Sequence, residues 1–462
     1  MLLKTKLENL KSHLNNDNVL SKLEERYCYA KDALNLERDF KVPDLVIFVE
    51  TIEDIQKVVK YANEHSIPIV SRGAGTNMVG SCVCTQGGIV LNFSKMNKIL
   101  DINPVNLTAK VQPGAILGDF KKAVEKLNLF FPSDPSNYKV STIGGAVSQS
   151  SGGAMTFKYG TIKNYILSMT VVTADGNILT LGNETSKNPL GYHLSDLIIG
   201  SEGTLALISD ITLKLIPKPE TKKTIISYFN DANSMVKAVT ELTTKNIFPT
   251  AIDFMDNSSI KTVEDFLPSS LKNEYNYLLL IDIDGSINSV NEQLEQTKII
   301  LSEYDAKDIQ IPINKVESER IWEARHSSYA AATRLAPDVV SDDIIVPRNK
   351  LSEMIKTCEE ISEKHCLKIC LVGHLGDGNL HPQFVLNLED ETEFRNYQSA
   401  RSEMYEKVYS LGGNFSAEHG IGIEKKDFFE AKIDKQTLDY MKAIKKVFDP
   451  KNILNPDKIF NL

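Results

Sequence analysis

The chain has 462 residues, of which 42% are hydrophobic and 24% are charged, and these proportions exclude a disordered or fibrous protein. Its formal net charge of -9 argues against a general nucleic-acid or anionic-membrane binder, although a local basic pocket for a small anion remains compatible with it. No apolar run reaches the roughly 18–20 residues of a membrane span, and residues 1–20 lack the apolar core of a signal peptide. We therefore expect a cytoplasmic protein of two or three domains.

The first residues predict a helical arm over 1–38, followed by a domain of short strands and glycine-rich loops over 39–219. The arm is inferred from leucines at near-helical spacing, namely Leu2, Leu3, Leu7, Leu10 and Leu14. In the domain, residues 51–64 predict an amphipathic helix and residues 68–71 a strand that runs directly into glycines. Residues 171–179 predict a hairpin around Asp175-Gly176.

Residues 220–425 predict a second domain, the substrate or cap domain, in which a strand–helix–strand pattern occurs twice. The first copy covers 224–229, 232–243 and 251–255, and the second covers 277–283, 290–304 and 309–312. Two such units predict a ferredoxin-like sheet with helices on one face, and thus an α+β chain. Further helices are expected over 351–367 and 392–411, and residues 426–462 are expected to pack back on the first domain.

Three loops rich in Gly, Ser and Thr lie in the first domain, at 71–81, 132–160 and 198–205. Glycine lets backbone N–H groups approach a phosphate closely. The first loop is neither a Walker A loop, because Ser81 stands where Lys is needed, nor a dinucleotide fingerprint, because Met78 stands where the third glycine is needed. A single loop of this kind is compatible with both a structural turn and a ligand-binding loop. Three such loops in one domain favour a long, phosphate-bearing ligand.

These loops resemble those of the FAD-binding domain of vanillyl-alcohol-oxidase-type (PCMH) flavoproteins. The resemblance implies a PCMH-type domain in which the first two loops hold the FAD diphosphate. The residues that it marks as FAD contacts are Arg72, Gly73, Ala74, Gly75, Thr76, Asn77, Ser81, Pro132, Ser141, Thr142, Gly144, Gly145, Ser148, Gly152, Gly153, Gly203 and Ile208. Some members tether the flavin through a histidine of the first loop, but residues 71–81 contain none, so non-covalent FAD is expected.

The clearest chemical signal is a pair of motifs near the C-terminus. A two-residue turn at Asp377-Gly378 would place His374 directly opposite His381, with Cβ atoms roughly 4.5–5.5 Å apart. The second motif adds Glu418 and His419, which are adjacent and would point to opposite sides of an extended segment. Two imidazoles and a carboxylate suit a catalytic metal ion, whereas the alternative is that the histidines are hydrogen-bonded core residues.

The two motifs resemble the C-terminal half of the FAD-linked D-2-hydroxyacid dehydrogenases, a family that includes D-lactate dehydrogenase, D-2-hydroxyglutarate dehydrogenase and the glycolate oxidase catalytic subunit. The likeness runs from about residue 38 to the end of the chain and includes residues 321–325 and 448–456. The family more often has Glu-Asp where this chain has Asp342-Asp343. The resemblance implies that His374, His381 and Glu418 bind one divalent metal, and that His419 is the catalytic base.

Oxidation of a 2-hydroxy acid gives each of these groups a task. The metal, for which Zn, Mn and Fe(II) are all suitable, would lower the pKa of the substrate hydroxyl, and His419 would accept its proton. Arg325 would bind the carboxylate through its planar fork, unless it only forms an ion pair with a nearby acidic side chain. FAD would take the hydride at N5. D-lactate, oxidised to pyruvate, is the first substrate candidate, followed by glycolate and D-2-hydroxyglutarate.

Two other functions stay open, a non-catalytic FAD-binding electron-relay subunit and a metal-dependent hydrolase with glycine-rich turns but no flavin. The six cysteines form no CxxC motif and no iron–sulfur spacing. The electrons are therefore expected to leave through a partner, such as an electron-transferring flavoprotein or an iron–sulfur subunit, or to quinone.

Overall fold

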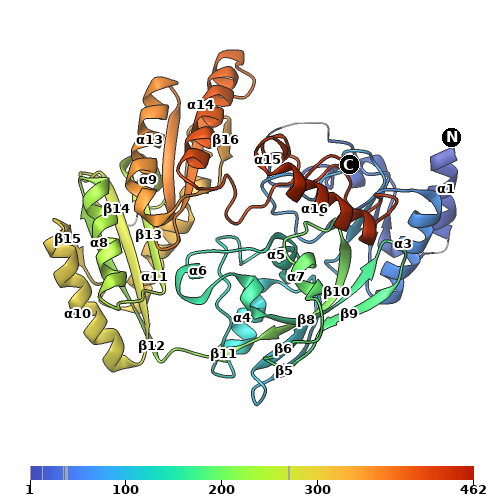
Figure 1. The fold of residues 1–462 in the computed structure, drawn as a ribbon, viewed down its shortest axis with the longest axis horizontal. Coiled ribbons are helices and arrows are strands. Elements are labelled where there is room, and N and C mark those ends of the chain that lie inside the picture. Colours follow the sequence, from blue (N-terminus) through green and yellow to red (C-terminus); the bar gives the residue numbers. More distant parts are fainter. Residues whose placement is uncertain (1, 13, 35, 37–39, 269–270) are drawn as a thin grey trace. The chain divides into compact units, whose positions relative to one another are not determined.

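The structure, a computed structural model, describes residues 2–12, 14–34, 36, 40–268 and 271–462. It contains two compact units (Figure 1). Unit 1 comprises residues up to 151, residues 161–218 and residues 418–462, and unit 2 comprises residues 152–160 and 219–417. Both units combine helices with sheets, which confirms the expected α+β class.

Unit 1 contains two sheets and a short two-stranded ribbon. The first sheet has the order β1-β2-β4-β3, in which β2, β3 and β4 are parallel, and the second is antiparallel with the order β5-β6-β10-β8-β9. The strands are β1 (Val19–Leu20), β2 (Leu45–Phe48), β3 (Ile69–Arg72), β4 (Ile89–Asn92), β5 (Ile99–Asn103), β6 (Thr108–Val111), β7 (Leu129–Phe130), β8 (Ile166–Thr173), β9 (Ile178–Gly182), β10 (Ala206–Lys214) and β11 (Ile216–Pro217). The predicted hairpin is confirmed, because Val172 of β8 pairs with Ile178 of β9.

The helices of unit 1 are α1 (Leu2–Ser12), α2 (Leu23–Tyr27), α3 (Ile52–His65), α4 (Leu117–Glu125), α5 (Ile143–Gln149), α7 (Leu194–Ile198), α15 (Lys426–Lys432) and α16 (Lys435–Phe448). Two 3-10 turns, η1 (Asn16–Asn18) and η2 (Ile162–Tyr165), complete the unit. Helix α3 confirms the prediction over 51–64, since the Thr51 hydroxyl accepts a hydrogen bond from the N–H of Asp54 and begins the helix.

The predicted arm begins with α1, whose Leu7 and Leu10 are buried in one core with residues of α3 and β2. The side chains of Leu2 and Leu3 and the end of the arm, residues 37 and 38, lie outside the described part of the chain. Helix α1 is therefore part of the unit 1 core.

Unit 2 is built on one sheet with the order β15-β12-β14-β13-β18-β19-β16, and β17 also pairs with β19. The four neighbouring strands β15-β12-β14-β13 have the ferredoxin-like order that the repeated strand–helix–strand pattern predicted. The strands are β12 (Thr221–Phe229), β13 (Ala251–Asp256), β14 (Tyr277–Gly285), β15 (Lys307–Gln310), β16 (Asp338–Ser341), β17 (Ile344–Ile345), β18 (Lys368–His374) and β19 (Asn379–Leu386). The hairpin of β18 and β19 extends the sheet beyond the ferredoxin-like part.

Helices cover both faces of this sheet, so the expectation of helices on one face was wrong. The helices are α6 (Thr156–Tyr159), α8 (Ala232–Thr244), α9 (Asn257–Phe266), α10 (Ile287–Glu303), α11 (Lys315–His326), α12 (Ser328–Ala332), η3 (Arg348–Lys350), α13 (Leu351–Lys364) and α14 (Glu391–Ser410). Helices α9, α11 and α12 share a core with Ala251 and Leu280 on one face, while α8, α10 and α13 contact β12, β14 and β18. The reason is that β14 is buried at nearly every position, so both of its faces need apolar cover.

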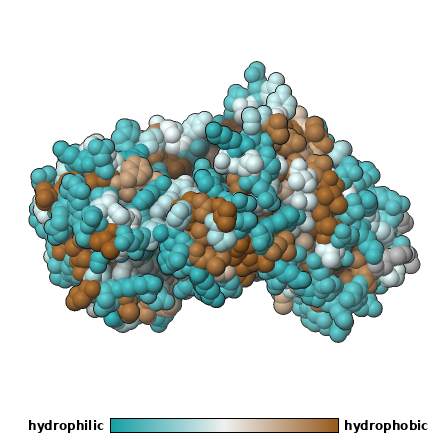
Figure 2. Space-filling model, turned by 90° about the horizontal axis from the view of Figure 1, so that it is seen from below, coloured by the Kyte–Doolittle hydropathy of each residue, from teal (hydrophilic) through white to brown (hydrophobic). Residues whose placement is uncertain are grey.

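The surface in Figure 2 is mainly hydrophilic, with hydrophobic patches between the polar areas. In the described part of the chain, no helix is long and apolar enough to span a membrane.

Lys458 is a buried cation in unit 1, 3% exposed, whose pKa is lowered by burial to about 8. In the unfolded chain the pKa of this group is near 10.5. The contribution of Lys458 to the free energy of unfolding is therefore fully present above pH 10.5 and is lost as the pH falls through 8. We expect the free energy of unfolding of the wild type, relative to Lys458→Met, to rise by about 2–3 kcal/mol from pH 7 to pH 10. Urea unfolding of both proteins at both pH values tests this, and an unchanged difference would contradict it.

Candidate functional site

The glycine-rich loops of unit 1 lie against one another. A Cβ atom at Gly73 would come within 2.2 Å of the Thr142 hydroxyl oxygen, which belongs to the second loop. In the third loop, a Cβ atom at Gly203 would come within 2.3 Å of the hydroxyl oxygen of Ser71. Because no side chain fits at these two positions, the three loops can approach this closely only with glycine there.

The same loops contain polar groups that the protein itself leaves without partners. Within the part of the chain that the structure describes, the backbone N–H groups of residues 73–76 donate to no protein acceptor. The buried hydroxyl groups of Ser133, Ser141 and Ser201 also make no hydrogen bond to a described residue. Buried polar groups are nearly always paired, so these loops fit a polar ligand such as the diphosphate of FAD.

Arg72, the first of the expected FAD contacts, is buried against its own loop. Its guanidinium carbon lies 5.6 Å from the ring centre of Tyr29, and its Nη1 lies 3.4 Å from the carbonyl oxygen of Cys82. A Cβ atom at Gly75 would lie 2.1 Å from Arg72 Nη2, and Gly75 has a φ of +75°. The guanidinium therefore supports the loop backbone.

The other expected FAD contacts divide between the units. Gly152 and Gly153 belong to unit 2, and those from Arg72 to Ser148, together with Gly203 and Ile208, belong to unit 1. Ala74, Thr76 and Ser81 lie in the first loop, and Pro132 begins the second. Gly144 and Gly145 lie in the first turn of α5, while Ile208 lies in strand β10.

Glu202 connects the third glycine-rich loop to the first loop and to residues 421–422. It was not identified from the sequence. Its carboxylate accepts hydrogen bonds from the N–H groups of Ile421 (2.7 Å) and Gly422 (2.8 Å) and from the hydroxyl of Ser81. Burial raises the pKa of Glu202, and these donors oppose that effect. The available signal was a single acidic residue between glycines in a loop of small hydroxyl residues.

His374 and His381 lie on one face of the unit 2 sheet, but not directly opposite each other as predicted. His374 pairs with Asn379 and His381 with Val372, so the two histidines are diagonal neighbours with ring centres 5.3 Å apart. The two-residue turn was wrong because four residues, 375–378, connect the strands. Leu375 instead donates its N–H to the carbonyl of Ile252 in β13, at 2.7 Å.

A buried carboxylate joins His374 to Arg325. Asp253 lies opposite His374 on strand β13, and its Oδ1 is 2.6 Å from His374 Nδ1, while its Oδ2 is 2.9 Å from Arg325 Nε. Burial alone would raise the pKa of Asp253, but His374 and Arg325 outweigh burial and lower it. A charged residue between the apolar residues of this strand was the signal for this aspartate.

A second buried aspartate lies beside His381. Asp343 Oδ1 is 3.9 Å from His381 Nδ1 and accepts a hydrogen bond from the side chain of Asn379 at 2.9 Å. Its Oδ2 accepts the N–H of Ala417 at 2.8 Å and thus holds the residue that precedes Glu418. Glu418 and His419 are the first residues of the last segment of unit 1, so the full ligand set remains a prediction.

Asp342, where the family more often has Glu, has a separate role in unit 2. Its carboxylate lies 3.1 Å from Nε of Arg401 and accepts the hydroxyl of Tyr405, and all three side chains are buried. The carboxylate of Asp342 is thus paired with Arg401 and Tyr405 within the core of unit 2.

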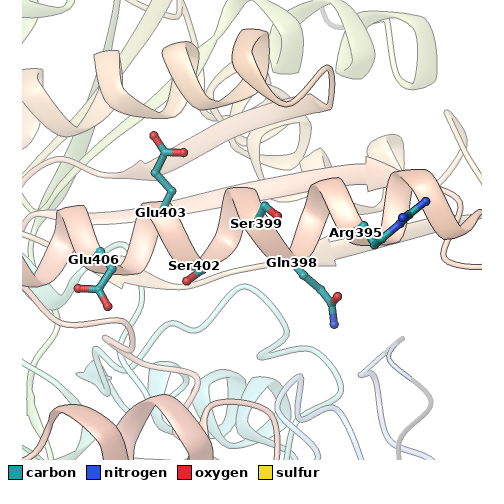
Figure 3. A pocket seen from close by; sticks show the side chains of 6 residues that line it. All are labelled: Arg395, Gln398, Ser399, Ser402, Glu403 and Glu406. Carbon is teal, nitrogen blue, oxygen red and sulfur yellow. The ribbon is translucent and has the colours of Figure 1, made fainter.

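A cavity of about 590 Å³ lies along α14 and contains none of the expected site residues. It is lined by Arg395, Gln398, Ser399, Ser402, Glu403 and Glu406. In Figure 3, Glu403 points away from the side on which Gln398 and Glu406 lie.

Comparisons with known proteins agree with this architecture. Residues 43–182 match the FAD binding domain, and residues 218–459 match the C-terminal domain of FAD linked oxidases. The glycolate oxidase subunit GlcD of Bacillus subtilis is 39% identical over 94% of this chain and 92% of its own length. A D-lactate dehydrogenase of Anaerostipes hadrus is 34% identical over 90% of this chain and 89% of its own length.

Among solved structures, p-cresol methylhydroxylase has a TM-score of 0.82 at 18% identity, covering 99% of this chain and 97% of its own. This likeness confirms the expected PCMH-type fold. By its two matching domains and its full-length relatives, the chain belongs to the FAD-linked oxidases, in the group of the GlcD glycolate oxidase subunits and the D-lactate dehydrogenases.

Proposed function

We propose that the chain oxidises a short D-2-hydroxy acid to the 2-oxo acid, with non-covalent FAD and one divalent metal ion. D-lactate, giving pyruvate, is the first candidate, and glycolate is the second. The observation that carries the proposal is the arrangement of His374, His381, Asp253 and Arg325 in unit 2, all buried on or against one face of the sheet. A hydroxy acid has a hydroxyl and a carboxylate, and these groups match a metal-binding imidazole pair and a guanidinium.

Arg325 would bind the substrate carboxylate. Its side chain is 6% exposed, and its Nη2 has no hydrogen-bond partner among the described residues. A buried guanidinium nitrogen without a partner favours an anion that supplies the missing acceptor.

His374 and His381 would hold the metal ion together with Glu418, which is joined by one peptide bond to Ala417, the residue bound to Asp343. Their donor set of two imidazoles and a carboxylate suits Zn, Mn or Fe(II), and a bound divalent ion supplies Lewis-acid polarisation of the substrate hydroxyl. His419 would then accept the hydroxyl proton as general base.

The loops at 73–76, 141–145 and 200–203 would hold FAD, which supplies a hydride acceptor when bound. The unpartnered N–H groups of residues 73–76 and the buried hydroxyl groups of Ser141 and Ser201 support this assignment. The matches to FAD-binding domains support it independently.

Two considerations favour a substrate with a single carboxylate. The relatives at 39% and 34% identity are a glycolate oxidase subunit and a D-lactate dehydrogenase. The second is that the Arg325 guanidinium pairs with one carboxylate. The electrons would then pass to a partner such as an electron-transferring flavoprotein or an iron–sulfur subunit.

An anaerobic titration of the metal-replete protein, followed through the visible absorbance of FAD, tests the proposal. We expect D-lactate or glycolate to bleach the flavin and L-lactate to leave it oxidised. A yellow protein that no 2-hydroxy acid reduces would instead indicate an electron-relay subunit. A protein that binds no FAD would contradict the flavin assignment.

A further inference from the structure

We propose that Asp253 is a positioning residue that orients the metal-binding imidazole of His374 and the substrate-binding guanidinium of Arg325 at the same time; the inference rests on the proposed function. Asp253 is fully buried, and each of its two carboxylate oxygens lies near a different one of these groups.

The contact with His374 fixes which ring nitrogen faces the metal. Because a carboxylate only accepts hydrogen bonds, His374 Nδ1 donates its hydrogen to Asp253 Oδ1 over 2.6 Å. The lone pair of the neutral ring is then on Nε2, which is the atom that can coordinate a cation. Without Asp253 the ring can adopt the other tautomer and can rotate.

The contact with Arg325 holds one edge of the guanidinium. Arg325 Nε lies 2.9 Å from Asp253 Oδ2, although neither atom has a well-aligned hydrogen bond, so the contact is a buried ion pair. The Nη2 nitrogen has no partner among the described residues and stays available for a second carboxylate. Asp253 therefore neutralises the guanidinium without occupying its Nη2.

One carboxylate thus sets the positions of two groups that must act on the same small molecule. The hydroxyl oxygen and the carboxylate oxygens of a 2-hydroxy acid are separated by two carbon atoms, so the spacing between metal and guanidinium has to be matched to the substrate. An amide at this position would present N–H donors to a guanidinium or an imidazole that are themselves donors. Asp253→Asn should therefore disturb both positions together.

The test compares Asp253→Asn with Asp256→Asn, a matched control on the same strand. Asp256 accepts the N–H of Ser259 at the start of α9 at 2.8 Å, and asparagine can replace it in that role. The FAD-loaded proteins are titrated with Zn²⁺ alone in competition with a chromophoric chelator, and kcat and KM for the reducing hydroxy acid are measured separately. We expect a 10–100-fold weaker Zn²⁺ affinity and a raised KM in Asp253→Asn, and neither change in Asp256→Asn.

Two further variants separate positioning from a merely structural role. Arg325→Lys should raise KM at unchanged Zn²⁺ affinity, and Asp253→Glu, which keeps the charge, should recover part of both losses. If Asp253→Asn lowers only the melting temperature, while Zn²⁺ affinity and KM stay at the wild-type values, the inference is overturned. A wild type that binds no Zn²⁺ and is reduced by no hydroxy acid would instead overturn the proposed function.

Discussion

Replacing His419 by alanine should slow the reduction of the flavin by substrate about 10²–10⁴-fold, because the variant lacks the group proposed to accept the hydroxyl proton. FAD should stay bound. His419 contacts the first glycine loop through its backbone, since its carbonyl oxygen accepts a hydrogen bond from the Asn77 side chain at 3.4 Å. That bond does not need the imidazole. Stopped-flow measurement of flavin bleaching, together with the FAD content after gel filtration, tests the prediction.

His365→Ala is the matched control for this experiment. His365 follows directly after α13, and its Nε2 lies 2.9 Å from a carboxylate oxygen of Glu403, near the surface of unit 2. We expect this variant to be reduced at the wild-type rate. A His419→Ala protein that is also reduced at that rate would remove His419 from the role of base.

Glu202→Ala should lower the free energy of unfolding by about 3–5 kcal/mol and weaken FAD binding. The substitution leaves two backbone N–H groups, those of Ile421 and Gly422, and the Ser81 hydroxyl without their common acceptor. Ser81 is in the first glycine loop, and Glu202 precedes Gly203 in the third, so the loops that would hold FAD lose one of their connections. Urea unfolding and the FAD dissociation constant are the two measurements.

Two comparisons sharpen this prediction. Ser81→Ala removes one of the three hydrogen bonds and should lower the free energy of unfolding by about 1 kcal/mol. Glu184→Ala removes an exposed glutamate of the same unit and should change neither quantity. If Glu202→Ala unfolds at the same urea concentration as Glu184→Ala, the carboxylate does not hold these segments together.

The sequence predicted the repeating elements of unit 2 well, but it could not predict which carboxylates are buried between distant segments. The strand–helix–strand pattern of unit 2 was correct because hydrophobic periodicity is local. The two-residue turn after His374 was wrong because the N–H of Leu375 pairs with strand β13, which is more than a hundred residues distant in the chain. Tertiary hydrogen bonds of this kind leave no local trace.

Asp253, Glu202 and Asp343 were missed for the same physical reason. Each is a buried carboxylate whose partners come from distant segments, so its role follows from the packing of those segments and not from its neighbours in sequence. Arg72 lies in the expected loop, and its contacts with Tyr29 and Cys82 likewise could not be predicted from its neighbours in sequence.

The chain passes between the two units four times, after residues 151, 160, 218 and 417, and this limits how the protein can be divided. A fragment of residues 219–417 would lack residues 152–160, which supply Phe157, whose ring stacks on Phe248 at 4.9 Å, and Tyr159, whose hydroxyl donates to Asp284. Neither unit is therefore one continuous stretch of chain. Synthesis of the chain cannot complete one unit before the other has begun, and a single proteolytic cut cannot release either unit whole.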